Sequence, residues 1–272
     1  MIRKYIKLFF FFCVVASYFT STTILRAIAR EKKRKLNWST RALSFHSALM
    51  NKALGIRVSL QSRGNGIDSG KSMLILSNHL SYVDIFVISS FFPVSFIASV
   101  DEVKSDLLLG KATELSGGYF VERRSRSGLR TEIESISEIL ELGINVALFP
   151  EGTTSNGDRV LPFKTPLLSI AQKAGVRILP LCLKYTSIDG EALTDKNKDL
   201  IYYYGDMKFF DHLFKLLSVG YVEAELRVLD KIDPQAAHSR KEMASAVYDM
   251  INSAYMNKGI AEPAANGWPP GL

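Results

Sequence analysis

The sequence predicts an α/β fold, a single mixed, mainly parallel sheet flanked by helices, with an N-terminal membrane-associated helical segment. Two observations lead to this class. Short apolar runs typical of buried strands alternate with helix-length segments between residues 56 and 229, and residues 8–25 carry no charged side chain. We therefore expect a membrane anchor and basic linker over residues 1–37, a folded domain over 38–258 and a disordered tail over 259–272.

The charge of the chain is concentrated at its N-terminus. The formal net charge is +7, but residues 1–40 contain nine basic residues and one acidic residue, which gives 9 − 1 = +8 and leaves −1 for the rest. A nucleic-acid-binding domain would carry the basic residues itself, so no nucleic-acid partner is expected. The two cysteines, Cys13 and Cys182, lie far apart in apolar surroundings, which excludes a disulfide framework and fits a reducing compartment.

The N-terminal segment is expected to associate with a membrane. Residues 8–25 are about as long as the shortest helix that spans a bilayer, but serines and threonines make their second half polar. Basic residues flank both ends, so the positive-inside rule gives no orientation. We interpret the segment as an anchor that spans or half-inserts; a cleaved signal peptide and a buried core helix are the alternatives. The basic cluster at 30–35 is placed to meet anionic headgroups, or else is a solvated linker.

The first elements of the domain follow from residue periodicity. Residues 38–54 have apolar side chains at helical spacing, and residues 56–60 alternate as a strand does. The turn-rich stretch 64–70 is followed by Lys-Ser and so faintly resembles a phosphate-binding P-loop. That motif needs a glycine where Asn65 stands and a helix where a strand follows, so nucleotide binding is not expected.

The remaining strands and helices alternate along the chain. Strands are expected at 73–76, 94–99, 119–121, 145–149, 176–183 and 222–229. Helices are expected at 84–91, 103–115, 127–142, 165–174, 206–217 and 239–256. The helix at 127–142 has the clearest pattern, because its isoleucines share one face and Gly143 follows it as a C-terminal glycine should. The segment 206–217 fits a core-facing helix or, given its phenylalanines, a membrane-dipping one.

Polar side chains follow three of the expected strands. His79, Arg123 and Glu151 each come after an apolar run, and ligand sites in such sheets lie beyond the carboxyl ends of the strands. Asp84 begins the next expected helix, from which it can fold back onto the loop of His79. A histidine oriented by a carboxylate can take a proton from a hydroxyl group near neutral pH. The other three histidines, His46, His212 and His238, have no acid placed for a shared role and are expected to be structural.

Four blocks of sequence carry a resemblance to a known family. They are Asn78-His79-x4-Asp84, Gly118-Tyr119-Phe120-Val121-Glu122-Arg123, Phe149-Pro150-Glu151-Gly152-Thr153 and Ile178-Leu179-Pro180-Leu181. In order and spacing they resemble the glycerolipid acyltransferase family, that of the bacterial 1-acyl-sn-glycerol-3-phosphate acyltransferases. The resemblance covers residues 38 to 229, and it rests on all four blocks together, since each motif alone is weak.

The resemblance implies acyl transfer from an acyl thioester, on coenzyme A or acyl carrier protein, to the free hydroxyl of a lysophospholipid. In this family pattern His79 and Asp84 of the HX4D motif are catalytic, and Pro180 lies near the acyl site. The residues implied for acceptor binding, to which we add Lys164 as a source of positive charge, are Arg123, Glu151, Gly152, Thr153 and Lys164. The acceptor first implied is 1-acylglycerol-3-phosphate, which would give phosphatidic acid. No cofactor and no metal are expected, only the thioester as co-substrate.

Two positions depart from the family pattern and leave the acceptor open. Phosphate-acceptor members often carry arginine where this chain has Thr154, and aspartate where it has Glu122. The stretches 154–157 and 161–164 also resemble members that acylate other lysolipids, including lyso-ornithine lipid. Acylation of such a lipid, or of a zwitterionic lysophospholipid, is therefore the alternative function.

Three other functions are weighed against acyl transfer. They are a lipid hydrolase that uses the same histidine on water, a non-catalytic lipid-binding module, and a secreted or periplasmic protein with a cleaved leader. The intact residues His79, Asp84 and Glu151 argue against a non-catalytic module. Use of cytoplasmic thioesters implies location at the inner (cytoplasmic) membrane, with the catalytic domain facing the cytoplasm and membrane lipids as partners.

Overall fold

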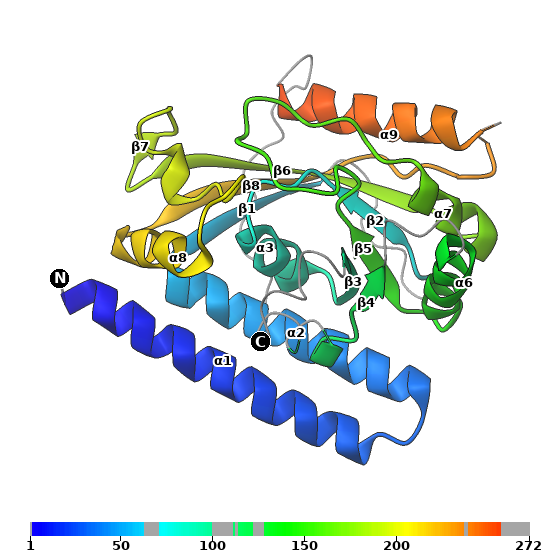
Figure 1. Ribbon diagram of the computed structural model, residues 1–272, viewed down its shortest axis with the longest axis horizontal. Coiled ribbons are helices and arrows are strands. Elements are labelled where there is room, and N and C mark those ends of the chain that lie inside the picture. Colours follow the sequence, from blue (N-terminus) through cyan, green and yellow to red (C-terminus); the bar gives the residue numbers. More distant parts are fainter. Residues whose placement is uncertain are drawn as a thin grey trace.

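A mixed β-sheet runs through the centre of the molecule between two layers of helices (Figure 1). The computed structural model describes residues 2–62, 71–99, 111, 114–121, 128–236 and 239–256. The strands in this part of the chain are β1 (Ile56–Ser62), β2 (Leu74–Ser77), β3 (Val94–Ser99), β4 (Tyr119–Val121), β5 (Asn145–Leu148), β6 (Ile178–Ile188), β7 (Glu191–Ala192) and β8 (Val222–Val228). Their order in the sheet is β1-β8-β6-β2-β5-β3-β4, with β7 paired to β6.

The pairing confirms the predicted mixed, mainly parallel sheet. Strands β2, β5, β3 and β4 and the neighbouring β6 run parallel, as do β1 and β8, while β6 is antiparallel to β8 and to β7. The strands β2 and β5 are buried along nearly their whole length, because helices or loops cover both faces. Because β2, β5 and β6 run parallel, their carboxyl ends lie at the same edge of the sheet.

Helices cover both faces of the sheet. They are α1 (Ile2–Ile28), α2 (Lys32–Leu54), α3 (Val83–Phe91), α6 (Gly128–Glu141), α7 (Ser169–Ala174), α8 (Phe209–Ser218) and α9 (Arg240–Tyr255), with short 3-10 turns η1 (Pro166–Leu168) and η2 (Lys198–Leu200). In Figure 1, α9 lies across one face, whereas α3 and α2 lie on the other and α1 packs outside α2. The buried side chains of all these layers form one hydrophobic core.

The observed elements differ from the expected ones mainly in length. Helix α2 begins at Lys32, so the basic residues 32–35 are helical rather than linker. The expected helix at 165–174 is divided into η1 and α7, and β7 and η2 carried too few residues to leave a pattern. The expected helix at 103–115 lies largely outside the described residues, as do Arg123 and the tail 259–272.

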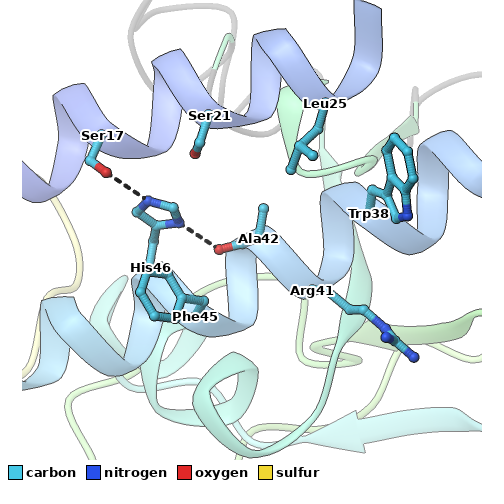
Figure 2. Close-up of a pocket in the computed structure, with 8 residues that line it drawn as sticks. All are labelled: Ser17, Ser21, Leu25, Trp38, Arg41, Ala42, Phe45 and His46. Atoms are coloured by element: carbon cyan, nitrogen blue, oxygen red, sulfur yellow. Dashed lines mark hydrogen bonds between the residues drawn. The ribbon is translucent and has the colours of Figure 1, made fainter. Parts of the chain in front are cut away.

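Helices α1 and α2 form an antiparallel hairpin with a groove of about 390 Å³ between them (Figure 2). His46 of α2 lies in this groove, with Nδ1 2.8 Å from the carbonyl oxygen of Ala42 and Nε2 3.1 Å from the hydroxyl of Ser17 on α1. A carbonyl oxygen only accepts, so Nδ1 carries the proton and Nε2 accepts from Ser17. His46 thus links the two helices, in agreement with its predicted structural role.

By length and composition, helix α1 is long and apolar enough to cross a membrane, and most of it is not buried in the protein. Most of its large apolar side chains are exposed, including Phe9, Phe10 and Phe12. An apolar helix with this much exposed aromatic surface indicates membrane association.

A buried lysine attaches α1 to the domain. The ammonium group of Lys7, on the buried side of α1, donates to the carbonyl oxygens of Leu54, Val219 and Gly220 at 2.7, 2.8 and 2.9 Å. Leu54 is the last residue of α2, and Val219 follows α8. Carbonyl groups at helix C-termini lack partners within the helix and attract positive charge, so one side chain satisfies the ends of two helices.

Replacing Lys7 by methionine is expected to lower the free energy of unfolding by about 2–4 kcal/mol, because buried carbonyls lose a charged donor. Thermal or chemical unfolding in detergent measures this loss. The matched control is Lys33→Met, which removes the same charge from an exposed position of α2. Equal stability of the two variants would show that the Lys7 contacts contribute nothing to docking of α1.

Candidate active site

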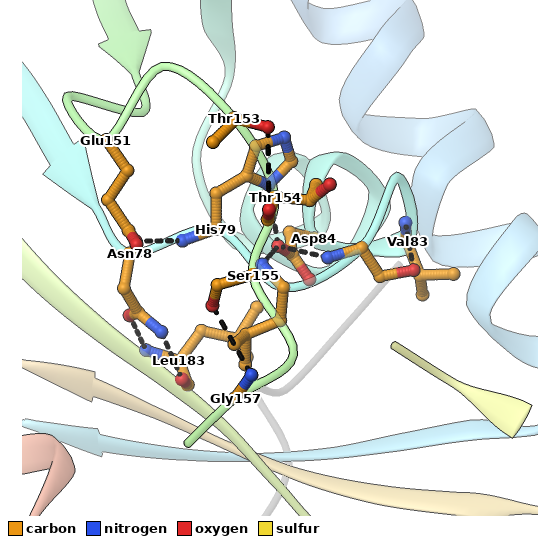
Figure 3. Close-up of polar contacts among 12 residues, drawn as sticks. Asn78, His79, Val83, Asp84, Glu151, Thr153, Thr154, Ser155, Gly157 and Leu183 are labelled. Carbon is orange, nitrogen blue, oxygen red and sulfur yellow. Dashed lines mark hydrogen bonds and ion pairs between the residues drawn. The ribbon is translucent and has the colours of Figure 1, made fainter. Parts of the chain in front are cut away.

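The centre of the site is the carboxylate of Asp84, which is 0% exposed. Its Oδ2 atom lies 2.6 Å from the backbone nitrogen of Leu80, 2.9 Å from that of Ser81 and 2.8 Å from Nδ1 of His79. The backbone nitrogen of Asp84 in turn donates to the carbonyl oxygen of Ser81. The four residues between His79 and Asp84 therefore close into a tight loop around one carboxylate oxygen at the start of α3 (Figure 3).

This arrangement selects the tautomer of His79. An ionised carboxylate only accepts hydrogen bonds, so the bond to Asp84 places the proton on Nδ1 and leaves the lone pair on Nε2. The imidazole is 16% exposed, whereas the Asp84 side chain is fully buried. The structure thus brings together the predicted pair in the geometry that a general base requires.

Tyr185 supplies a fourth donor to Asp84, which the sequence analysis missed. Its hydroxyl group lies 2.7 Å from Oδ1 of Asp84, and its side chain is 1% exposed. Burial and the neighbouring charge of Asp84 raise the pKa of Tyr185 well above its ordinary value, so the phenol remains a donor. The contact exists because β6 continues past Leu181, which pairs with the last residue of β2, and carries Tyr185 beyond the end of that strand.

An aromatic stack fixes the plane of the His79 ring. Phe149, the residue after β5, lies parallel to the imidazole with ring centroids 3.7 Å apart and an interplanar angle of 5°. Phe96 of β3 stacks behind Phe149 at 5.7 Å. Phe149 belongs to the third sequence block, but its function as a support for the histidine was not predicted. The sequence feature that could have indicated this function is an aromatic residue directly before the Pro-Glu-Gly turn.

Glu151 holds the loop of the third block against the loop of the first. Its side chain is 3% exposed, and its two carboxylate oxygens accept from the backbone nitrogens of His79 and Leu161, each at 2.7 Å. Burial raises the pKa of Glu151 to about 7, although the bonds from Leu161 and His79 act in the opposite direction. The carbonyl oxygen of His79 also accepts from the nitrogen of Ser155, so the two loops are joined on both sides. Direct contact of Glu151 with an acceptor lipid remains a prediction.

The other predicted acceptor-binding residues differ in where they lie. Gly152 is buried with a φ of +71°, a conformation that favours glycine, and it turns the chain so that Thr153 is exposed. Lys164 is exposed, and its backbone nitrogen donates to the carbonyl oxygen of Pro150 at 2.8 Å, which closes the loop between them. Arg123 lies outside the described residues, so its part in the site remains a prediction.

Pro180 lies inside the sheet beside the first block. It is buried in β6 opposite Leu76 of β2, and its carbonyl oxygen accepts from the nitrogen of Leu229 at 3.0 Å. Proline lacks the N–H that a central strand normally donates, so its presence between two strands is unusual. The side chain of Asn78 replaces backbone pairing just beyond the end of β2, bonding both the nitrogen and the oxygen of Leu183 at 2.8 Å.

Among the described residues, no group of three or more His, Cys, Asp or Glu side chains is arranged to hold a metal ion. At this edge of the sheet the structure brings together the histidine, its carboxylate and the loops around them. These residues can remove a proton from a hydroxyl group and hold a substrate against it.

Comparison with known proteins identifies the family. An acyltransferase family model matches residues 59–184, a range that contains all four sequence blocks. A lyso-ornithine lipid O-acyltransferase of Brucella abortus is 32% identical over 85% of this chain and 89% of that protein. A 1-acyl-sn-glycerol-3-phosphate acyltransferase of Neisseria gonorrhoeae is 40% identical over 66% of this chain and 68% of that protein.

The chain belongs to the glycerolipid acyltransferase family. A solved structure agrees on the fold: the 1-acyl-sn-glycerophosphate acyltransferase PlsC of Thermotoga maritima has a TM-score of 0.67 and 21% identity, over 96% of this chain and 99% of that one. The protein is therefore an O-acyltransferase of the lysophospholipid type, as the four sequence blocks predicted.

Replacing Tyr185 by phenylalanine is expected to lower kcat about tenfold with little change in KM, since a bond to a charged acceptor contributes about 1.5–3 kcal/mol. The reason is that Tyr185 acts through Asp84 on the orientation of His79 and does not contact substrate. Steady-state kinetics measure the two constants. Tyr202→Phe, a change at a neighbouring buried tyrosine, serves as the control; an unchanged kcat in Tyr185→Phe would remove its positioning role.

Glu151 is expected to make stability depend on pH. Because its pKa is raised in the folded state, folding takes up a proton between the ordinary carboxyl pKa and about 7, and the free energy of unfolding falls as the pH rises through this range. Glu151→Gln lacks this titration. The free energy of unfolding of the wild type, minus that of the variant, should therefore fall by about 1–3 kcal/mol from pH 5 to pH 8. Denaturant unfolding of both proteins across this range measures this value. A value that stays constant or rises with pH would contradict the account.

Proposed function

We propose that the acyltransferase moves an acyl chain from a thioester to the free hydroxyl group of a lysolipid, with His79 as the general base. The observation that carries the proposal is the 2.8 Å bond between Nδ1 of His79 and a fully buried Asp84. Four donors surround this carboxylate, so the imidazole is held in one tautomer with Nε2 available to a substrate. The relatives reported above are named for acylation of lysolipids, which supports the substrate class.

The reaction needs one base and no covalent acyl-enzyme intermediate. Nε2 of His79 takes the proton of the acceptor hydroxyl while the oxygen attacks the thioester carbonyl carbon. The tetrahedral intermediate then breaks its carbon–sulfur bond, and the leaving thiolate receives the proton from the imidazolium. Asp84 stabilises the charged ring between these two transfers, as the acid of a catalytic triad does. Holding both substrates against one rigid loop supplies much of the remaining rate enhancement.

The first acceptor to consider is 1-acylglycerol-3-phosphate, which would give phosphatidic acid. The arginine of the second block and the relative from Neisseria gonorrhoeae support this choice. Lyso-ornithine lipid is the second candidate. Thr154 stands where phosphate-acceptor members often carry arginine, and the relative from Brucella abortus is named for that lipid.

The donor and the location follow from the chemistry of the substrates. Coenzyme A and acyl carrier protein both present acyl chains as thioesters, and either fits the proposed step. Such thioesters are cytoplasmic, so we place the enzyme at the inner membrane with its catalytic domain on the cytoplasmic side. The apolar helix α1 supports attachment to the membrane but does not by itself select which one.

The test is product mass spectrometry of the full chain in detergent, given acyl-CoA or acyl carrier protein thioester. The acceptors are lysophosphatidic acid, a zwitterionic lysophospholipid and lyso-ornithine lipid. His79→Ala is expected to lower turnover about 10²–10⁴-fold, because proton removal by a positioned base contributes that much. Folding and vesicle binding should be unchanged, since the side chain is partly exposed and its backbone bonds remain.

The outcomes of this test separate the candidate functions. Activity of more than a few per cent in His79→Ala would end the assignment of the base. Release of free fatty acid without any acceptor would indicate a hydrolase. Conversion chiefly of lysophosphatidic acid would place the enzyme in phosphatidic acid synthesis, whereas conversion chiefly of lyso-ornithine lipid would show that Thr154 marks a changed headgroup site.

A further inference from the structure

Helix α8 exposes a pair of phenylalanines on the outside of the protein. Phe210 and Phe214 are 55% and 40% exposed, and their spacing of four residues places them side by side on one face of the helix. The opposite face is buried through His212, Leu213 and Leu216. Helix α8 thus has apolar side chains on both faces. A helix that serves only the core needs one apolar face, so the exposed pair calls for a partner.

The exposed pair lies next to α1. The ammonium group of Lys4 lies 5.0 Å from the centre of the Phe214 ring, and α1 and α8 pack against one another (Figure 1). Next to Lys4 along α1, Tyr5 begins an exposed stripe that Phe9 and Phe12 continue at helical spacing. We call the residues Tyr5, Phe9, Phe12, Phe210 and Phe214 the α1–α8 aromatic surface.

The buried face of α8 is connected to the catalytic loop. Tyr82, which lies between His79 and Asp84 in sequence, places its hydroxyl 3.1 Å from Nδ1 of His212 and its ring 5.0 Å from that of Phe209. A backbone hydrogen bond adds to this contact: the nitrogen of Tyr203 donates to the carbonyl oxygen of Leu80 at 3.0 Å. Helix α8 therefore presents the aromatic pair on its exposed face and contacts the loop that carries the base with its buried face.

We propose that the α1–α8 aromatic surface inserts into a phospholipid bilayer, so that α8 forms a second membrane contact beside the active site. Contact with α1, whose exposed apolar side chains indicate membrane association, selects a bilayer as the partner. The charges along α8 are mixed: Lys208 and Lys215 stand beside Asp211. Insertion of aromatic rings, rather than attraction to anionic headgroups, is therefore the main contribution, and added salt should change it little.

This contact would have a consequence for catalysis. It holds the end of the sheet that carries His79 at the membrane surface, where a lysolipid acceptor resides. The inference rests on the membrane association of α1, while its link to turnover rests also on the proposed function. The experiment is therefore designed so that insertion is measured without an activity assay.

The test places a tryptophan at position 210 and measures its quenching by brominated lipids. The full chain, with Trp38 and Trp268 replaced by phenylalanine, carries Phe210→Trp and is bound to vesicles of brominated phosphatidylcholine. We expect its fluorescence to fall about twofold or more relative to unbrominated vesicles, as it does for side chains at the headgroup–acyl boundary. The matched control is Leu60→Trp on the edge strand β1, a 39% exposed position that should not be quenched.

Two further results decide the inference. If Phe210→Trp is not quenched in vesicle-bound protein, α8 does not enter the bilayer and the proposal is wrong; protection from aqueous acrylamide in that case would assign the surface to a protein partner or a second copy. The double variant Phe210→Ser/Phe214→Ser should lose about tenfold in turnover of acceptor presented in vesicles but keep turnover of acceptor in detergent micelles. Loss in both media would indicate damage to the catalytic loop and overturn the membrane role of the pair.

Discussion

The carboxylate of Asp84 is the interaction on which the rest of the site depends. It is fully buried, and a buried charge is stable only where donors surround it. Here the donors are two backbone nitrogens of its own loop, the imidazole of His79 and the phenol of Tyr185. The same four bonds that make burial of the charge possible also fix the loop, the tautomer of the histidine and the position of α3. Catalytic geometry and the conformation of this loop thus depend on the same carboxylate.

The sheet brings the remaining parts of the site to this carboxylate. Strands β2 and β5 are parallel neighbours, so the residues that follow them, His79 and Phe149, meet at one edge and stack. Glu151 then joins the two loops through backbone bonds, and the long strand β6 extends past both to deliver Tyr185. On the outside, Lys7 attaches α1 to the ends of α2 and α8. The apolar helix is therefore held against the folded domain by these bonds.

Sequence patterns predicted the fold class and the His79–Asp84 pair because both depend on local order. The fold class follows from alternating strand and helix periods, and the pair is only five positions apart in the chain. They missed Tyr185 because it is 101 positions from its partner and lies two residues beyond the predicted end of β6. Phe149 was quoted within a motif, but stacking is a property of two strands in register, which periodicity does not give. The structural role of Glu151 was not predicted, because its partners are backbone groups, and these do not depend on which side chains the partner residues carry.

The most direct test of this account is the protonation of the His79 ring, read from nitrogen-15 chemical shifts of histidine-labelled protein in detergent. The chain has four histidines, and His79→Gln identifies the signals of this one. The measurement is made about two pH units above the ordinary histidine pKa, where an unperturbed ring is neutral. The account predicts a proton on Nδ1, bonded to Asp84, and a bare Nε2. A proton on Nε2 with a bare Nδ1 would contradict it, because that ring could neither donate to the carboxylate nor accept the proton of a lipid hydroxyl.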